Sequence, residues 1–142
     1  MITRIVFIIV SVVAVVFALL YMHTSNATVD ISCDDFATQG GAVSTEMEVD
    51  TWADLLTVTL CSNPTTGFKW ELTENTDEMV LEYKSNEYLP PEATGAVGAG
   101  GKEIWTFKPL KHGESTISMK YGRSWEGGEK EEWTFTLTAT VK

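Results

Sequence analysis

Apolar and polar residues alternate strictly along the last segment of the chain, a pattern typical of a β-strand with one buried face. The apolar residues between Trp133 and Val141 share one face, and threonines occupy the positions between them. The same two-residue period recurs upstream, where long stretches with helical spacing are lacking. We predict further strands at Val29–Cys33, Val43–Val49, Leu56–Cys61, Phe68–Leu72, Met79–Tyr83, Glu103–Lys108 and Ile117–Tyr121.

These segments indicate an all-β fold. Short strands separated by turn residues, seven or eight of them here, predict an immunoglobulin-like antiparallel β-sandwich. A closed barrel built from the same strands has the same pattern and is the alternative. Hydrophobic residues make up 44% of the chain, which is enough to build a core.

The acidic net charge of the chain excludes one class of function, nucleic-acid binding. The chain carries 10 Lys and Arg against 20 Asp and Glu, a net charge of −10. A nucleic-acid binder needs a basic face, so we expect no nucleic-acid partner. Its two histidines, His23 and His112, are too few for a histidine-rich metal site, and we expect neither a metal ion nor a cofactor.

The N-terminal segment differs from the rest of the chain. Arg4 precedes an apolar run from Ile5 to Met22, and small residues at the end of the segment fit a cleavage site after residue 27. The run lies at the lower edge of the roughly 17–25 residues of a membrane-spanning helix. We expect residues 1–27 to be a signal peptide or a signal anchor. Residues 28–142 then form an exported domain, either secreted or held in the membrane by residues 5–22.

Export changes the interpretation of the two cysteines, Cys33 and Cys61. An oxidising compartment favours a disulfide between them. A nucleophilic cysteine is the alternative, but it needs a positioned base. His112 is the only histidine of the exported part, and it lies in a turn-like segment. The chemistry therefore favours the disulfide.

Three loops carry unusual residues. In the first, Asn63 to Gly67, Pro64 fixes φ, Gly67 permits a positive φ, and Asn63 can hydrogen-bond its own backbone. This loop should therefore be stiff. The second, Gly95 to Gly101, fails both nucleotide-binding patterns, and its bare backbone allows another chain to approach and pair with it.

The third loop, Tyr121 to Gly128, places Trp125 among glycines and charges beside Arg123, a composition typical of a binding hot spot. Each loop also has a simpler explanation: a well-made turn, a flexible linker, or a tryptophan folded back over the sandwich. In an immunoglobulin-like sandwich the three loops would share one end. Together they predict a binding surface and not an active site.

With these loops the sequence resembles the chagasin family of inhibitors of papain-like cysteine peptidases. The family pattern is an NPTTG loop, a GxGG loop and an RPW loop, in that order. The matching residues are Asn63, Pro64, Thr65, Thr66 and Gly67, followed by Phe68; Gly98, Ala99, Gly100 and Gly101; and Arg123 and Trp125, with Ser124 in place of the usual proline.

The resemblance implies a tight, reversible, non-covalent inhibitor whose partner is a papain-like cysteine peptidase, and we expect it to act as a monomer. By analogy, the tip formed by Thr65 and Thr66 enters the active-site cleft. The Gly98–Gly101 loop lies along one side of the cleft, and Arg123 and Trp125 grip the other.

Two other function classes compete with the inhibitor. An exported adhesion or ligand-binding module could use Trp125 as its platform. It has no need, however, for a proline-braced threonine tip beside a glycine strand. An enzyme would need a base for Ser62 or Ser124, and His112 is the one histidine available in the exported part.

Overall fold

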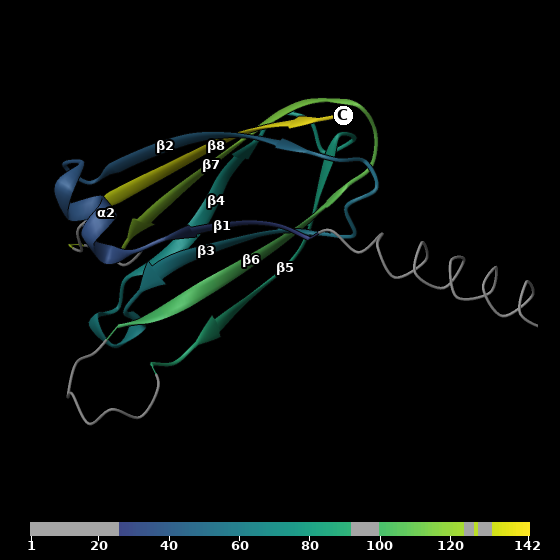
Figure 1. The fold of residues 1–142 in the computed structure, drawn as a ribbon. Coiled ribbons are helices and arrows are strands. Elements are labelled where there is room, and N and C mark those ends of the chain that lie inside the picture. Colours follow the sequence, from purple (N-terminus) through teal and green to yellow (C-terminus); the bar gives the residue numbers. More distant parts are fainter. Residues whose placement is uncertain (1–25, 92–99, 124–126, 128–131) are drawn as a thin grey trace, which may run out of the picture.

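The computed structural model describes residues 26–91, 100–123, 127 and 132–142. They form two packed four-stranded sheets (Figure 1). The strand order in the first sheet is β1 (Ala27–Ile31), β3 (Leu56–Ser62), β6 (Gly101–Pro109) and β5 (Leu81–Leu89). The order in the second sheet is β2 (Ala42–Val49), β8 (Trp133–Val141), β7 (Gly113–Gly122) and β4 (Lys69–Asn75). A short helix, α2 (Cys33–Thr38), joins β1 to β2.

The predicted all-β sandwich is confirmed, and the two separate sheets exclude a closed barrel. The prediction of a wholly antiparallel sandwich is wrong at two edges. β1 runs parallel to β3, and β2 runs parallel to β8. The reason is the path of the chain: α2 and β2 carry it to the second sheet, and it returns before β3 begins. β3 therefore starts at the same end as β1, where Ala27 pairs with Leu56.

The alternating residues meet between the sheets as one core. Phe135, Leu137 and Ala139 of β8 are completely buried, as predicted from their period. Leu56, Val58 and Leu60 of β3, which lies in the other sheet, are buried in the same cluster. Burial of such side chains is the main force that holds the two sheets together.

The first predicted strand, Val29–Cys33, is displaced toward the C-terminus, because β1 spans Ala27–Ile31. Ser32 instead begins α2 with a capping box. The Asp35 N–H donates to the Ser32 hydroxyl at 3.3 Å, and the Ser32 N–H donates to the Asp35 carboxylate at 2.8 Å. The helix that follows buries Phe36 completely.

The fifth strand was also misplaced, since Met79–Tyr83 was predicted and β5 spans Leu81–Leu89. Asp77 closes a turn before it by accepting backbone hydrogen bonds from Val80 and Leu81, both at 3.0 Å. Beyond Glu82 the residues of this edge strand are exposed on both faces, so they have no hydrophobic period by which to recognise a strand.

A disulfide joins Cys33 to Cys61, which confirms the predicted pairing. It ties the start of α2 to the end of β3, immediately before the first unusual loop. Within residues 26–91, 100–123, 127 and 132–142, no helix has the length and apolar character to cross a membrane.

Candidate functional site

The described ends of the three loops lie at one end of the sandwich. At the end of β3, Ser62 pairs with Gly101 at the start of β6. At the start of β4, Lys69 pairs with Gly122 at the end of β7. Figure 1 shows β3, β6 and β7 reaching this end, with the 3-10 turn at Pro64–Thr66 between β3 and β4. The predicted convergence is therefore present in the described part of the loops.

The first loop is a compact, internally braced turn. Thr66 N–H donates to the Asn63 carbonyl at 3.1 Å, and Gly67 N–H donates to the Pro64 carbonyl at 2.9 Å. The Thr66 hydroxyl also donates to the Asn63 carbonyl, and the Thr65 hydroxyl donates to Asn63 Oδ1, both at 2.6 Å. The Asn63 side chain thus takes part in bracing the turn, by accepting from the Thr65 hydroxyl. Backbone and hydroxyl groups therefore brace the turn from within, and its three tip residues are exposed.

Gly67 ends the turn in the left-handed conformation, with φ +82°. This confirms the requirement for glycine, because a side chain is strained at that φ. The next residue, Phe68, is buried against Tyr121, with ring centroids 5.3 Å apart. Phe68 therefore supports the loop from below, and little of it is exposed to a partner.

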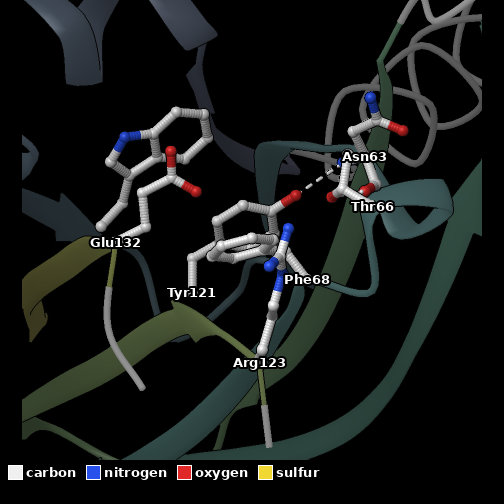
Figure 2. A pocket seen from close by; sticks show the side chains of 7 residues that line it. Asn63, Thr66, Phe68, Tyr121, Arg123 and Glu132 are labelled. Atoms are coloured by element: carbon white, nitrogen blue, oxygen red, sulfur yellow. Dashed lines mark hydrogen bonds between the residues drawn. The ribbon is translucent and has the colours of Figure 1, made fainter. Parts of the chain in front are cut away.

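Arg123 lies across the aromatic floor of the site. Its guanidinium carbon is 4.4 Å from the centroid of the Phe68 ring, a cation–π distance. A hollow of about 380 Å³ opens beside it (Figure 2) and is lined by Asn63, Thr66, Phe68, Tyr121, Arg123, Glu132 and Trp133. The third loop thus begins in contact with the residue that follows the first.

A buried polar network fixes the base of the first loop. Glu103 of β6 is 6% exposed, and its carboxylate accepts from the Ser62 hydroxyl at 2.7 Å and from the Trp70 N–H at 3.4 Å. The Trp70 indole donates to the Cys61 carbonyl at 2.9 Å. Residues on both sides of the loop are therefore held to one carboxylate. Removing it would leave buried donors without a partner, at about 1–3 kcal/mol.

Tyr121 connects this base to the third loop. Its hydroxyl accepts a hydrogen bond from the Asn63 N–H at 2.8 Å, drawn as a dashed line in Figure 2. Burial raises the pKa of the Tyr121 phenol above its ordinary value of 10.0, although the hydrogen bond from the Asn63 N–H partly offsets the increase. The folded chain therefore holds this proton more tightly than the unfolded chain does.

We expect the free energy of unfolding to fall with rising pH above about 10, because the unfolded chain then ionises Tyr121 before the folded chain does. The stability is fully present below that pH and is lost as the pH rises through the raised pKa. Urea unfolding from about pH 8 to 11 measures it. In Tyr121→Phe this contribution should be absent, and an alkaline dependence equal to that of the unchanged chain would contradict the prediction.

The second loop approaches the first through its last two glycines. A Cβ on Gly100 would lie 3.2 Å from the Ser62 carbonyl oxygen. A Cβ on Gly101 would lie 2.2 Å from the Leu89 carbonyl oxygen and 2.6 Å from the Tyr88 hydroxyl. Both positions therefore require close backbone approach, in agreement with the bare backbone predicted for this loop.

Several predicted site residues lie outside the described residues: Gly98, Ala99 and Trp125, together with Ser124. Trp70 and Trp105 are core residues, as predicted, with exposed fractions of 3% and 5%. Trp133, predicted for the core, is only partly buried and lines the hollow.

Tyr121 and Glu103 also support the site, and their roles were not predicted from the sequence. The available signal was weak: Tyr121 directly precedes Gly122 and Arg123, and Glu103 is an acidic residue within a predicted strand.

Residues 51–139, which include all three loops, match the model of the family described as Chagasin family peptidase inhibitor I42. Amoebiasin-2 of Entamoeba histolytica is 32% identical over 89 residues, which are 63% of this chain and 72% of the relative. Chagasin of Trypanosoma cruzi is 33% identical over 87 residues, 59% of this chain and 78% of the relative.

Among solved structures, that of the cysteine protease inhibitor EhICP2 from Entamoeba histolytica is similar, with a TM-score of 0.59 and 23% identity. The match covers 82% of this chain and 97% of that one. At this identity the likeness shows that the two chains share a fold.

Proposed function

The chain belongs to the chagasin family of peptidase inhibitors, and we propose that it blocks papain-like cysteine peptidases by laying its three loops over the active-site cleft. It is an inhibitor and not an enzyme. The inhibition is reversible and involves no covalent bond. The observation that carries the proposal is the braced, exposed turn at Pro64–Thr66. It lies at the same end of the sandwich as Gly100, Gly101 and Arg123.

The physical argument is preorganisation. Hydroxyls and backbone groups already fix the turn, so little conformational entropy remains to be lost on binding. Gly100 offers exposed backbone on one side of the tip, next to the buried Gly101, and we assign Gly98 and Ala99 to the same surface. Arg123, with Trp125, serves the other side. Nothing in this arrangement requires a cofactor.

The proposal is tested by titrating the protein against papain while following hydrolysis of a fluorogenic peptide. We expect stoichiometric inhibition that reverses on dilution. Thr66→Ala should weaken inhibition by about tenfold, because it removes the hydroxyl that braces the turn. Thr140→Ala makes the same chemical change near the far end of β8 and serves as the control. Equal inhibition constants for the two variants would contradict the role of the tip.

The third loop departs from the family pattern at Ser124. We therefore predict that restoring the proline of the family pattern at this position tightens inhibition. Proline in place of Ser124 would restrict φ and lower the entropy lost on binding. We expect Ser124→Pro to tighten inhibition by about 0.5–1 kcal/mol in the same titration. An unchanged or weaker inhibition constant would overturn this prediction.

The finer fold type that we propose is immunoglobulin-like. The order β1-β3-β6-β5 follows strands A-B-E-D of immunoglobulin domains, and β4-β7-β8 follows C-F-G, with β2 added at an edge. In such domains the B–C and F–G loops lie at the same end, and these loops correspond to the first and third loops here.

We also propose that the domain acts as a monomer.

We also propose that the chain is exported, with residues 1–27 serving as a signal peptide or anchor. The apolar run from Ile5 to Met22 supports this proposal. The disulfide between Cys33 and Cys61 also supports it, because disulfides persist in oxidising compartments.

A further inference from the structure

Three turns gather at the end of the sandwich opposite the inhibitory loops. The Leu110 N–H donates to the Val80 carbonyl at 2.9 Å, which joins the β6–β7 turn to the β4–β5 turn. The β2–β3 turn lies at the same end, where the Thr51 N–H donates to the carbonyl of Lys142 at 2.8 Å. Figure 1 shows these turns together at the end where β1 begins.

Each of these turns exposes one large apolar side chain. The exposed fractions are 77% for Trp52, 65% for Met79 and 47% for Leu110. The first two are the most exposed large apolar residues of the described part of the chain. Single exposed apolar residues need no explanation, but one on each of three turns at one end gives that end a common apolar character. Tryptophan in particular favours the interface between water and lipid.

The N-terminal segment enters the domain at this same end. Ala27, the first residue of β1, donates its N–H to the Leu55 carbonyl at 3.1 Å, beside the turn that carries Trp52. In the sequence, His23 to Asn26 alone separate this strand from the apolar run that ends at Met22. A linker of that length spans at most about 18 Å, even when fully extended. If the run crosses a bilayer, this end of the domain must lie close to the lipid headgroups.

We propose that residues 5–22 are retained as a membrane anchor and that the end bearing Trp52, Met79 and Leu110 rests on the bilayer surface. This inference rests on the proposed export of the chain. Arg4, before the run, favours an orientation with the N-terminus in the cytoplasm and the domain outside. The structure thereby supplies a reason to prefer the anchor over the cleaved signal peptide.

The charges at this end identify the kind of membrane contact. Acidic residues outnumber lysines there: Asp50, Asp54, Asp77 and Glu78 stand against Lys108, Lys111 and Lys142. Attraction to anionic lipid therefore cannot hold the domain, and the contact depends on the tether and the apolar side chains. The bilayer that fits is a neutral one.

This orientation serves the inhibitor. β7 has ten residues and runs from the membrane end to the site, a span of about 33 Å at the usual rise of a strand. The Pro64–Thr66 tip therefore faces away from the bilayer, where a peptidase outside the cell can reach it.

The test places the full chain in phosphatidylcholine vesicles that contain a lipid with a nitroxide on its headgroup, and measures quenching of tryptophan fluorescence. We expect quenching to be about twofold weaker in Trp52→Phe than in the unchanged chain, because Trp52 is the tryptophan at the lipid. Trp133→Phe removes a tryptophan at the opposite end of the domain. In this variant the nitroxide should quench the tryptophan fluorescence as strongly as in the unchanged chain. Equal quenching in the unchanged chain and Trp52→Phe would overturn the proposal.

Two further measurements separate this inference from the proposed function. Mass spectrometry of the protein from its own cells should find residues 1–27 retained, and cleavage after Ala27 would overturn the anchor. Papain inhibition, measured in detergent, should be the same for Trp52→Phe and the unchanged chain. If the unchanged chain shows no quenching beyond that of Trp52→Phe but inhibits papain, the membrane contact alone is rejected. If the unchanged chain is quenched as expected but neither protein inhibits papain, the proposed function alone is rejected.

Discussion

Gly101→Ala is expected to weaken peptidase inhibition by more than about tenfold while the chain remains folded. The added Cβ would lie 2.2 Å from the Leu89 carbonyl oxygen, and backbone cannot move aside as a flexible side chain can. The start of β6 must therefore shift away from the end of β5. Because Gly101 also pairs with Ser62, the shift reaches the base of the first loop.

The measurement compares the inhibition constant against papain with the free energy of unfolding in urea. A control is Gly40→Ala, since a Cβ at Gly40 meets nothing within 4 Å and its φ of +70° costs about 1 kcal/mol of stability alone. The control should inhibit as the unchanged chain does. If Gly101→Ala also inhibits normally, close packing at the base of the glycine loop has no part in binding.

Removing the disulfide should produce the largest loss of stability among these changes. The bond closes a sequence separation of 28 residues between Cys33 and Cys61, which stabilises the fold by about 3 kcal/mol through the entropy of the unfolded chain. The double variant Cys33→Ser and Cys61→Ser should lower the free energy of unfolding by that amount in urea.

The control for this prediction is the unchanged chain with its disulfide reduced, which should match the double variant. A difference below about 1 kcal/mol between oxidised and reduced protein would show that the closed loop contributes little. Expressed as free energies, the loss of affinity for papain should be smaller than the loss of stability. The reason is that the hydrogen bonds to the Glu103 carboxylate still hold the base of the first loop.

The strands that the sequence predicted best are those with one solvent-exposed face and one buried face. In β8 the threonines alternate with buried residues, and the structure buries those residues as expected. In β5 this signal is lacking, because an edge strand exposed on both sides has no period. The capping box at Ser32 and Asp35 was readable in principle, but the strand pattern before it was extended too far.

The backbone of the first loop could be predicted from local chemistry alone. Pro64 and Gly67 have backbone preferences that act within a few residues, so the turn and the positive φ followed from the sequence alone. The family resemblance rested on the same local motifs, and the family match confirmed it.

Other features depend on contacts between residues distant in sequence. Glu103 reaches Ser62 across 41 positions, and Tyr121 reaches Asn63 across 58, so no local pattern could assign them to the base of the loop. The parallel edges at β1 and β2 likewise depend on how the chain passes between sheets. The sequence by itself determined the strand periods, the stiff turn and the pairing of the cysteines, because these follow from short-range preferences and from the count of partners. The tertiary structure alone decided which buried groups brace the loop and which end of the domain meets its N-terminal segment, because packing brings those residues together.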